Sequence, residues 1–214
     1  MASIAIIDFG MGNLHSIAKA LEHVEGKHRV VVSSRRADIL AADRVVFPGV
    51  GAIRDCMAEL QASGLDQVVR EVACSKPLLG VCLGMQALLD TSEENQGIDC
   101  LGIIPGRVAR FAPDLKSGDG ARIKIPHMGW NQVMQRRIHP LWRNIPDGSR
   151  FYFVHSYYAI PEEDASVAAI TRYGIDFASV ILHDNVFAVQ FHPEKSQHAG
   201  LGLLSNFVGW DGES

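Results

Sequence analysis

The sequence of 214 residues is poor in cysteine, and its cysteines do not lie close together along the sequence. No Cys-x-x-Cys spacing occurs among the four, which are Cys56, Cys74, Cys82 and Cys100. Domains that depend on disulfides are far richer in cysteine, and structural zinc sites need closely spaced ligands. We therefore expect reduced thiols and no structural zinc.

A long hydrophobic run and a surplus of positive charge are also missing. Met1-Ala2-Ser3 leads into a short isoleucine-rich run that Asp8 interrupts, which fits neither a signal peptide nor a membrane span. Lys and Arg number 20 against 24 Asp and Glu, which argues against nucleic acid as the main partner. We expect a cytoplasmic protein with no membrane and no nucleic-acid partner.

Repeats, low-complexity segments and long linkers are absent from the sequence as well. With 47% hydrophobic residues, a chain of 214 residues can bury one well-packed core but falls short of two comfortable ones. The sequence therefore predicts a single domain over residues 1–214.

Hydrophobic runs and helical patterns alternate in the first part of the chain, which predicts an α/β fold with parallel strands and helical crossovers. The expected strands there are 3–7, 28–32, 44–47 and the run that ends at Cys82. Short strand candidates follow at 107–111, 122–125, 131–134, 151–157, 165–171, 178–183 and 186–191, before a final helix over 199–210. We expect a central, mostly parallel sheet with flanking helices and an additional antiparallel or mixed strand region.

The run Gly80-Val81-Cys82-Leu83-Gly84 predicts a strand, a sharp turn and a helix. Gly80 and Gly84 avoid collisions that side chains would make beside such a turn. The turn would lift the Cys82 sulfur clear of the sheet at a helix N-terminus, where thiolate is favoured. An isolated cysteine is more often buried and structural, but the two glycines favour a nucleophile.

His192-Pro193-Glu194 follows the last expected strand and supplies a base with a carboxylate two residues away. In an extended backbone both side chains point to the same face, and Pro193 disfavours a helix. The carboxylate can then orient the imidazole, so that Cys82, His192 and Glu194 form a candidate catalytic triad. A capped turn at a strand end is the alternative for this tripeptide alone.

Attack by a thiolate on a carbonyl creates an oxyanion that needs hydrogen-bond donors. The N–H of Leu83 directly follows the nucleophile, and the loop Pro48-Gly49-Val50-Gly51 could add a second donor at Val50 or Gly51. For that loop alone, a plain strand-to-helix turn is the alternative. The histidines and carboxylates show no metal-ligand spacing, so we expect no catalytic metal and no cofactor.

Two aromatic segments leave their roles open. The strand over 151–157 places His155 and Ser156 near its end, where either could face a ligand or complete a loop. His127-Met128-Gly129-Trp130-Asn131 interrupts the expected strands, and Trp130 could be an interface residue or a core residue. From the residues alone we favour the core.

With these motifs in place, the chain resembles the triad class of glutamine amidotransferases over essentially its whole length. The Cys82 turn and His192-Pro193-Glu194 mark the class. Four further segments resemble the glutaminase subunits of imidazole glycerol phosphate synthase: Gly10-Met11-Gly12-Asn13, Pro48-Gly49-Val50-Gly51, His127-Met128-Gly129-Trp130-Asn131 and Phe191-His192-Pro193-Glu194-Lys195-Ser196. Phe9 is a small departure from these subunits, in which Tyr is more familiar at this position.

The resemblance implies that Cys82 attacks the side-chain amide of L-glutamine, releasing ammonia and then glutamate. It implies glutamine-binding roles for Gln86, His155, Ser156 and Tyr157, and an oxyanion site at Val50, Gly51 and Leu83. It also implies a heterodimer with a (β/α)8-barrel cyclase that uses the ammonia in L-histidine biosynthesis. Candidate interface residues are Asn13, Trp130 and Lys195.

Two other hypotheses compete with this one. A glutaminase fold that has lost its activity could act as a regulatory or scaffolding subunit, although no member of the triad is missing. A cysteine hydrolase of a γ-glutamyl peptide could act without any synthase. Delivery of ammonia to a partner distinguishes the glutaminase from this hydrolase.

Overall fold

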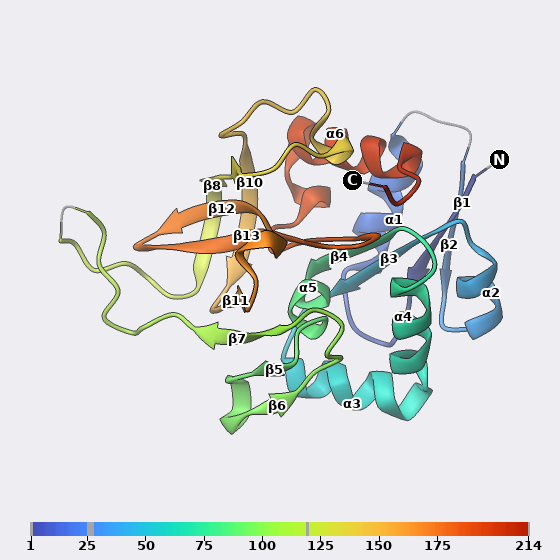
Figure 1. The fold of residues 1–214 in the computed structure, drawn as a ribbon, viewed down its shortest axis with the longest axis horizontal. Coiled ribbons are helices and arrows are strands. Elements are labelled where there is room, and N and C mark those ends of the chain that lie inside the picture. Colours follow the sequence, from blue (N-terminus) through green and yellow to red (C-terminus); the bar gives the residue numbers. More distant parts are fainter. Residues whose placement is uncertain (1, 25–27, 119, 214) are drawn as a thin grey trace.

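The computed structural model describes residues 2–24, 28–118 and 120–213 and confirms the α/β fold (Figure 1). In these residues twelve strands form one sheet, and five neighbours at one end of it are parallel, in the order β2-β1-β3-β4-β14. These strands are β1 (Ala2–Ile7), β2 (His28–Ser33), β3 (Arg44–Gly49), β4 (Leu78–Cys82) and β14 (Val186–Val189). The helices are α1 (Leu14–His23), α2 (Arg36–Ala41), α3 (Ile53–Ser63), α4 (Leu65–Ala73), α5 (Leu83–Ala87) and α6 (Gln197–Gly209).

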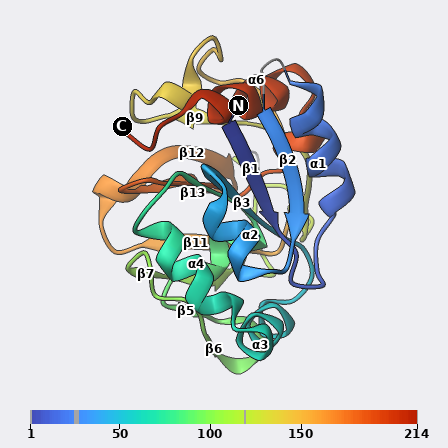
Figure 2. The same cartoon turned by 90° about the vertical axis from the view of Figure 1, so that its right-hand side faces the viewer.

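Helices cover both faces of the parallel part of the sheet, with α1 and α6 on one face and α2, α3 and α4 on the other (Figure 2). Successive side chains of β1 alternate between two hydrophobic cores. Ile4 and Ile6 pack with residues of α1 and α6, whereas Ile7 packs with residues of α3 and α4. Burial of both faces explains why the strands read as continuous apolar runs.

The second half of the chain extends the sheet with mainly antiparallel strands through β13, which pairs with β14. These strands are β5 (Thr91–Ser92), β6 (Ile98–Asp99), β7 (Gly106–Arg110), β9 (Met134–Gln135), β11 (Tyr157–Pro161), β12 (Val167–Tyr173) and β13 (Ile175–His183). Short 3-10 turns are η1 (Glu94–Gln96), η2 (Pro140–Trp142), η3 (Asp164–Ser166) and η4 (Pro193–Lys195). The predicted antiparallel or mixed region is therefore confirmed.

A separate two-stranded sheet joins β8 (His127–Gln132) to β10 (Arg150–His155). The expectation that His127-Met128-Gly129-Trp130-Asn131 interrupts the strands is therefore wrong. The strand predicted over 122–125 is also wrong, since this segment forms only an isolated bridge between Lys116 and Arg122. Its backbone lacks the neighbouring strand that β8 finds in β10.

Side chains of β8 alternate between the interior and the surface. His127 is buried, whereas Met128 is 63% exposed and Trp130 is 39% exposed. The prediction that Trp130 lies in the core is therefore wrong, because its position in the strand directs it outward. The T-shaped contact of its ring with Tyr152, at 6.1 Å, leaves much of the indole accessible.

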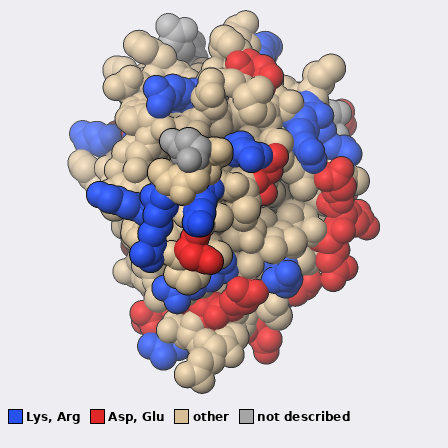
Figure 3. Space-filling view, turned by 90° about the vertical axis from the view of Figure 1, so that its left-hand side faces the viewer, with Lys and Arg blue, Asp and Glu red and all other residues tan. Residues whose placement is uncertain are grey.

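The end of the molecule that carries the antiparallel strands has a mixed charge (Figure 3). Basic side chains gather on one part of this face, and acidic side chains gather along another part of it. Among the described residues, this face therefore shows no continuous basic surface of the kind that binds nucleic acid. None of the helices in the described residues is long and apolar enough to cross a membrane.

Candidate active site

The turn between β4 and α5 holds Cys82 in a strained backbone conformation. Its φ of 55° and ψ of −108° are unusual for a residue with a side chain. A Cβ atom at Gly84 would lie 2.0 Å from the Phe47 carbonyl oxygen, and one at Gly80 would lie 3.0 Å from Ala188 Cβ. The predicted steric need for glycine is therefore confirmed at Gly84, and the fit at Gly80 is tight.

The Cys82 side chain lies at the end of β4 and is enclosed by the protein. The residue is 7% exposed, and it lines a cavity of about 350 Å³. The other lining residues are Val50, Gly51, Leu83, Gln86, Glu94, Pro126, Val154, His155, Ser156, Tyr157 and His192. The structure thus gathers every predicted oxyanion and glutamine-binding residue around the sulfur, together with the predicted base.

His192 and Glu194 are in contact inside the protein. The His192 Nδ1 atom lies 2.9 Å from Glu194 Oε1, and the two side chains are 2% and 3% exposed. The sequence predicted an extended backbone between them, and this prediction is wrong, because Pro193 begins the 3-10 turn η4. Proline suits the first position of a helical turn, where no N–H donor is required.

The charge of His192 is set by opposing effects. Burial disfavours the charged imidazolium, but interactions with the Cys82 thiol and the Glu194 carboxylate outweigh burial and raise the pKa of His192 to about 10. The Nε2 atom has no partner with hydrogen-bond geometry among the described residues. Catalytic hydrogen bonds are often open before substrate binds, so this geometry is compatible with proton transfer near Cys82.

The predicted oxyanion residues come from two neighbouring strand ends. β3 pairs with β4 so that Gly49 lies opposite Cys82, which brings the following Val50 and Gly51 beside Cys82. Gly51 has a φ of 99°, which glycine adopts without strain. Leu83 begins α5 directly after Cys82, so its N–H is among those without an acceptor within the helix.

Gln86 is held by the protein rather than left free. Its Nε2 donates to the Tyr157 carbonyl oxygen at 3.0 Å and to Gln190 Oε1 at 2.9 Å. Gln190 is fully buried, and its own Nε2 lies 3.8 Å from the Cys82 sulfur. Sequence reasoning missed Gln190 and Glu94 as residues of this site. A polar residue inside the apolar run 186–191 was the available signal for Gln190.

The three interface candidates are accessible to different degrees. Lys195 is exposed on η4, and Trp130 is exposed on β8. Asn13 is partly exposed, and its side chain accepts from the Ser16 N–H at 3.4 Å and so caps α1. β10 links β8 to η4 through Tyr152. The Tyr152 ring contacts Trp130, and the Tyr152 N–H donates to Oγ of Ser196, the residue directly after Lys195.

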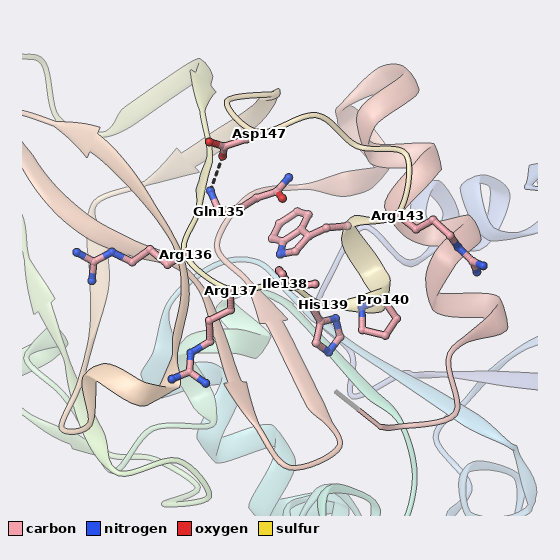
Figure 4. A pocket seen from close by; sticks show the side chains of 9 residues that line it. Gln135, Arg136, Arg137, Ile138, His139, Pro140, Arg143 and Asp147 are labelled. Carbon is pink, nitrogen blue, oxygen red and sulfur yellow. Dashed lines mark hydrogen bonds between the residues drawn. The ribbon is translucent and has the colours of Figure 1, made fainter.

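A second, larger cavity of about 780 Å³ lies around η2 and carries no comparable chemistry (Figure 4). Arg136, Arg137 and Arg143 line it, but Arg136 is paired with Asp164, and Asp147 accepts from the Gln135 N–H at 2.7 Å. It contains neither a cysteine nor an acid and base in contact. Across residues 2–24, 28–118 and 120–213, no cluster of three or more potential metal ligands occurs.

Comparisons with known proteins identify the family of this chain. The family model described as glutamine amidotransferase class-I matches residues 5–209. The imidazole glycerol phosphate synthase subunit HisH of Nitrosococcus oceani is 60% identical over 214 residues, covering 100% of both chains. The HisH subunit of Methylococcus capsulatus is 60% identical over 212 residues, covering 99% of this chain and 98% of the relative.

Solved structures support the same fold at low sequence identity. PurLQS from Thermotoga maritima superimposes with a TM-score of 0.69 at 15% identity, covering 97% of this chain and 98% of that chain. A glutamine amidotransferase superimposes with a TM-score of 0.68 at 16% identity, covering 97% and 99%. The chain belongs to the class-I glutamine amidotransferases. Within them it is a member of the HisH subunit family of imidazole glycerol phosphate synthase.

Proposed function

We propose that this chain hydrolyses L-glutamine at Cys82 and supplies the ammonia to a synthase partner in L-histidine biosynthesis. The observation that carries the site assignment is the buried pair of His192 and Glu194 beside a strained Cys82 in one cavity. We further propose that residues 1–214 act as one glutamine amidotransferase domain in the cytoplasm, without a cofactor.

The reaction proceeds in two steps that use the same residues. The Cys82 thiolate attacks the carboxamide carbon, and the N–H of Leu83 with a donor from the Val50-Gly51 loop stabilises the oxyanion. The charged His192 gives its proton to the nitrogen of the leaving group, so that ammonia departs and a glutamyl thioester remains on Cys82. His192 then takes a proton from water, and the resulting hydroxide attacks the thioester. Glutamate leaves with its new carboxyl proton lost to solvent, which restores the Cys82 thiolate beside a charged His192. Glu194 holds the ring orientation throughout.

The cavity matches glutamine in size and polarity. Its volume of about 350 Å³ lies at the small end of the range for ligand sites. We assign Gln86, His155, Ser156 and Tyr157 to binding of glutamine, because they line the same cavity as Cys82. The Glu94 carboxylate lines the same cavity and offers a counter-charge for the α-ammonium group.

The partner that we propose is a (β/α)8-barrel cyclase. The two relatives described above are both named as subunits of imidazole glycerol phosphate synthase, so ammonia made by this chain has a consumer in that complex. Transfer within a complex avoids protonation of ammonia in water, which would remove its nucleophilic lone pair. We assign Asn13, Trp130 and Lys195 to the interface.

Glutamate release from glutamine tests this function. The purified chain should release little glutamate alone and much more with the barrel cyclase and its ligand. Comparable release in both conditions would indicate an autonomous hydrolase, and a γ-glutamyl peptide should then be tried as the substrate. Absence of release in either condition would contradict the glutaminase function and favour a scaffolding subunit.

A further inference from the structure

A short segment, residues 50–52, joins the end of β3 to the start of α3, and we call it the oxyanion loop. At its β3 end the loop is held by the pairing of β3 with β4. At its α3 end only Ala52 lies between Gly51 and Ile53, the first residue of the helix. Gly51 has a φ of 99° and no side chain, so its neighbours must fix the direction of its N–H.

The N-terminus of α3 has no capping side chain of its own. Its N-cap residue is Ala52, which carries no side-chain oxygen, and the Cys56 N–H is the donor to the Ala52 carbonyl oxygen. The N–H groups of the first turn have no acceptor within a helix. Ile53 is 0% exposed, so an unpaired N–H at this residue would carry the cost of a buried polar group.

Glu94 supplies the missing acceptor from a segment 41 residues away along the chain. Its Oε2 atom accepts from the Ile53 N–H at 3.0 Å. A carboxylate at a helix N-terminus also interacts favourably with the helix dipole, so this contact is stronger than a hydrogen bond between neutral groups. The contact fixes the plane of the peptide that joins Ala52 to Ile53, and it thereby limits rotation within the oxyanion loop.

The segment that carries Glu94 has a strained backbone that hydrogen bonds hold in place. Asn95 and Gln96 have φ values of 53° and 72°, in the left-handed region that residues with side chains seldom adopt. The Glu94 N–H donates to Ser92 Oγ at 3.2 Å, and the Glu94 carbonyl oxygen accepts from the Gly97 N–H at 3.2 Å. Strain of this kind persists where the surrounding structure imposes it, and it gathers at functional sites.

Glu94 also lines the cavity that contains Cys82, together with Val50 and Gly51 of the oxyanion loop. A carboxylate has two oxygens and about four lone-pair sites, so the hydrogen bond from Ile53 leaves capacity for a ligand. The group that offers a counter-charge to the α-ammonium of glutamine is therefore also the group that fixes the oxyanion loop.

We propose that Glu94 is a positioning residue for glutamine hydrolysis, because its carboxylate holds the N-terminus of α3 and with it the oxyanion loop. This inference rests on the proposed function, since it takes that loop as a donor to the oxyanion. The contact between Glu94 and Ile53 does not involve the substrate. Loss of the acceptor should therefore lower kcat and not only raise KM.

Hydrogen exchange of the full-length chain, followed by ¹⁵N NMR, tests the contact without any activity. The Ile53 amide should exchange about 10-fold faster in Glu94→Ala, the effect of one hydrogen bond to a charged group. It should stay protected in Glu94→Gln, because the oxygen of an amide side chain also accepts. It should lose protection in Glu94→Asp, because the shorter side chain keeps the charge but does not reach Ile53.

Steady-state kinetics of the complex with the cyclase test the consequence for catalysis. Glu94→Ala and Glu94→Asp should lower kcat for glutamine hydrolysis about 10- to 100-fold, which is less than the loss of a whole oxyanion donor. Glu94→Gln should raise KM, because the counter-charge is gone, and should retain most of kcat. The opposite behaviour of the Asp and Gln variants separates the acceptor of α3 from the charge.

The adjacent Glu93 provides a matched control. Its Oε2 accepts from the Arg110 N–H at 3.0 Å, and its Oε1 accepts from the Arg107 guanidinium at 2.9 Å. Glu93→Ala thus removes a carboxylate from the same segment together with a similar backbone contact, but that contact leads to β7 and not to the oxyanion loop. It should leave kcat and the exchange of the Ile53 amide unchanged.

The outcomes separate this inference from the proposed function. Equal exchange of the Ile53 amide in the unaltered chain and in Glu94→Ala overturns the inference. So does a rise in KM alone in every Glu94 variant, which would leave Glu94 as a substrate contact, and so does an equal fall in kcat in Glu93→Ala. If Glu94→Ala does not fold, the comparison of Glu94→Asp with Glu94→Gln decides. The predicted exchange rates without glutamine hydrolysis in the unaltered complex would retain the contact with α3 and reject the glutaminase function.

Discussion

Two buried histidine contacts differ in charge, because one holds a charged imidazolium and the other holds two neutral rings. His192 touches the Glu194 carboxylate, and its pKa is raised to about 10, whereas His127 touches His155, and the pKa values of these rings fall to about 4 and 3. All of these histidines are at most 6% exposed, so burial alone does not decide the charge. The partner decides it, because a carboxylate compensates a buried positive charge and a second imidazole does not.

This difference in charge divides the chemistry between the two contacts. The charged pair of His192 and Glu194 can give a proton to ammonia as it leaves. The neutral pair of His127 and His155 cannot supply a proton readily at pH 7, and it serves to orient hydrogen bonds. Substitutions and pH changes should therefore affect the two pairs differently.

The largest effect is expected from Cys82→Ala, which removes the sulfur next to the charged pair. Glutamine-dependent synthesis by the complex with the cyclase should fall at least about 10³-fold, because no thioester can form. Synthesis from added ammonium salt should continue, since only the source of ammonia is lost. Equal loss of both activities in steady-state assays would show that Cys82 serves another purpose.

Within the charged pair, His192→Asn should be more harmful than Glu194→Gln. Loss of the base should cost about 10² to 10⁴-fold in glutamine hydrolysis. Loss of the orienting carboxylate should be about 10-fold milder or more, since it forms no bond to substrate. Glu194→Gln should also lower the pKa of His192, which ¹⁵N shifts measured across pH 6 to 10 can follow. Equal losses in single-turnover assays would contradict this ranking.

Gly200→Ala tests whether the η4 turn must be held in place for the charged pair. A Cβ at Gly200 would lie 1.9 Å from the Pro193 carbonyl oxygen, so α6 or the turn that carries Glu194 must move. We expect a loss of about 1–3 kcal/mol in the free energy of unfolding, together with reduced glutaminase activity. Gly209→Ala on the same helix meets nothing within 4 Å and serves as the control. Unchanged stability and activity in Gly200→Ala would show that the turn adapts.

The smallest effects concern stability against pH. The neutral pair resists protonation in the folded state, while the unfolded chain binds protons near pH 6.5, so stability should fall as the pH drops below that value toward 4. Each ring should contribute about 1 kcal/mol between pH 6.5 and 5.5. Urea denaturation should show a shallower decline in His127→Phe. An identical pH dependence in the variant and the unaltered chain would contradict the neutral state of His127.

The charged pair should show the reverse dependence. Its stabilisation is fully present below pH 6.5 and is lost as the pH rises through about 10. His192→Asn should therefore flatten the alkaline decline in the free energy of unfolding and leave the acid side almost unchanged.

The parallel half of the fold could be read from the sequence with small errors at element ends. The expected strand over 44–47 extends to Gly49, and the expected strands over 3–7 and 28–32 occur as β1 and β2. Local patterns suffice there because strands buried on both faces and amphipathic crossovers have strong signals. The three residues of the proposed triad could be named for the same reason, since each lies in a short motif.

The antiparallel half and the supporting residues depend on contacts that no local pattern records. β8 becomes a strand because β10 lies beside it, and no pattern within residues 127–131 predicts this pairing. Gln190 reaches Cys82 across the pairing of β14 with β4, at a separation of 108 residues. The 3-10 turn at Pro193 was missed because proline disfavours a helix interior yet suits the first turn.

The alternation of β8 limits how this segment can vary in length. His127, Gly129 and Asn131 share one face of the strand, and Met128 and Trp130 share the other. Deletion of Gly129 would reverse the facing of every later residue relative to His127, so that the indole would turn inward and the amide outward. A substitution in β8 alters one side chain, whereas the insertion or deletion of one residue moves every later side chain of the strand to the opposite face. Variation in length should therefore be accommodated in the loops beside β8 and not within it.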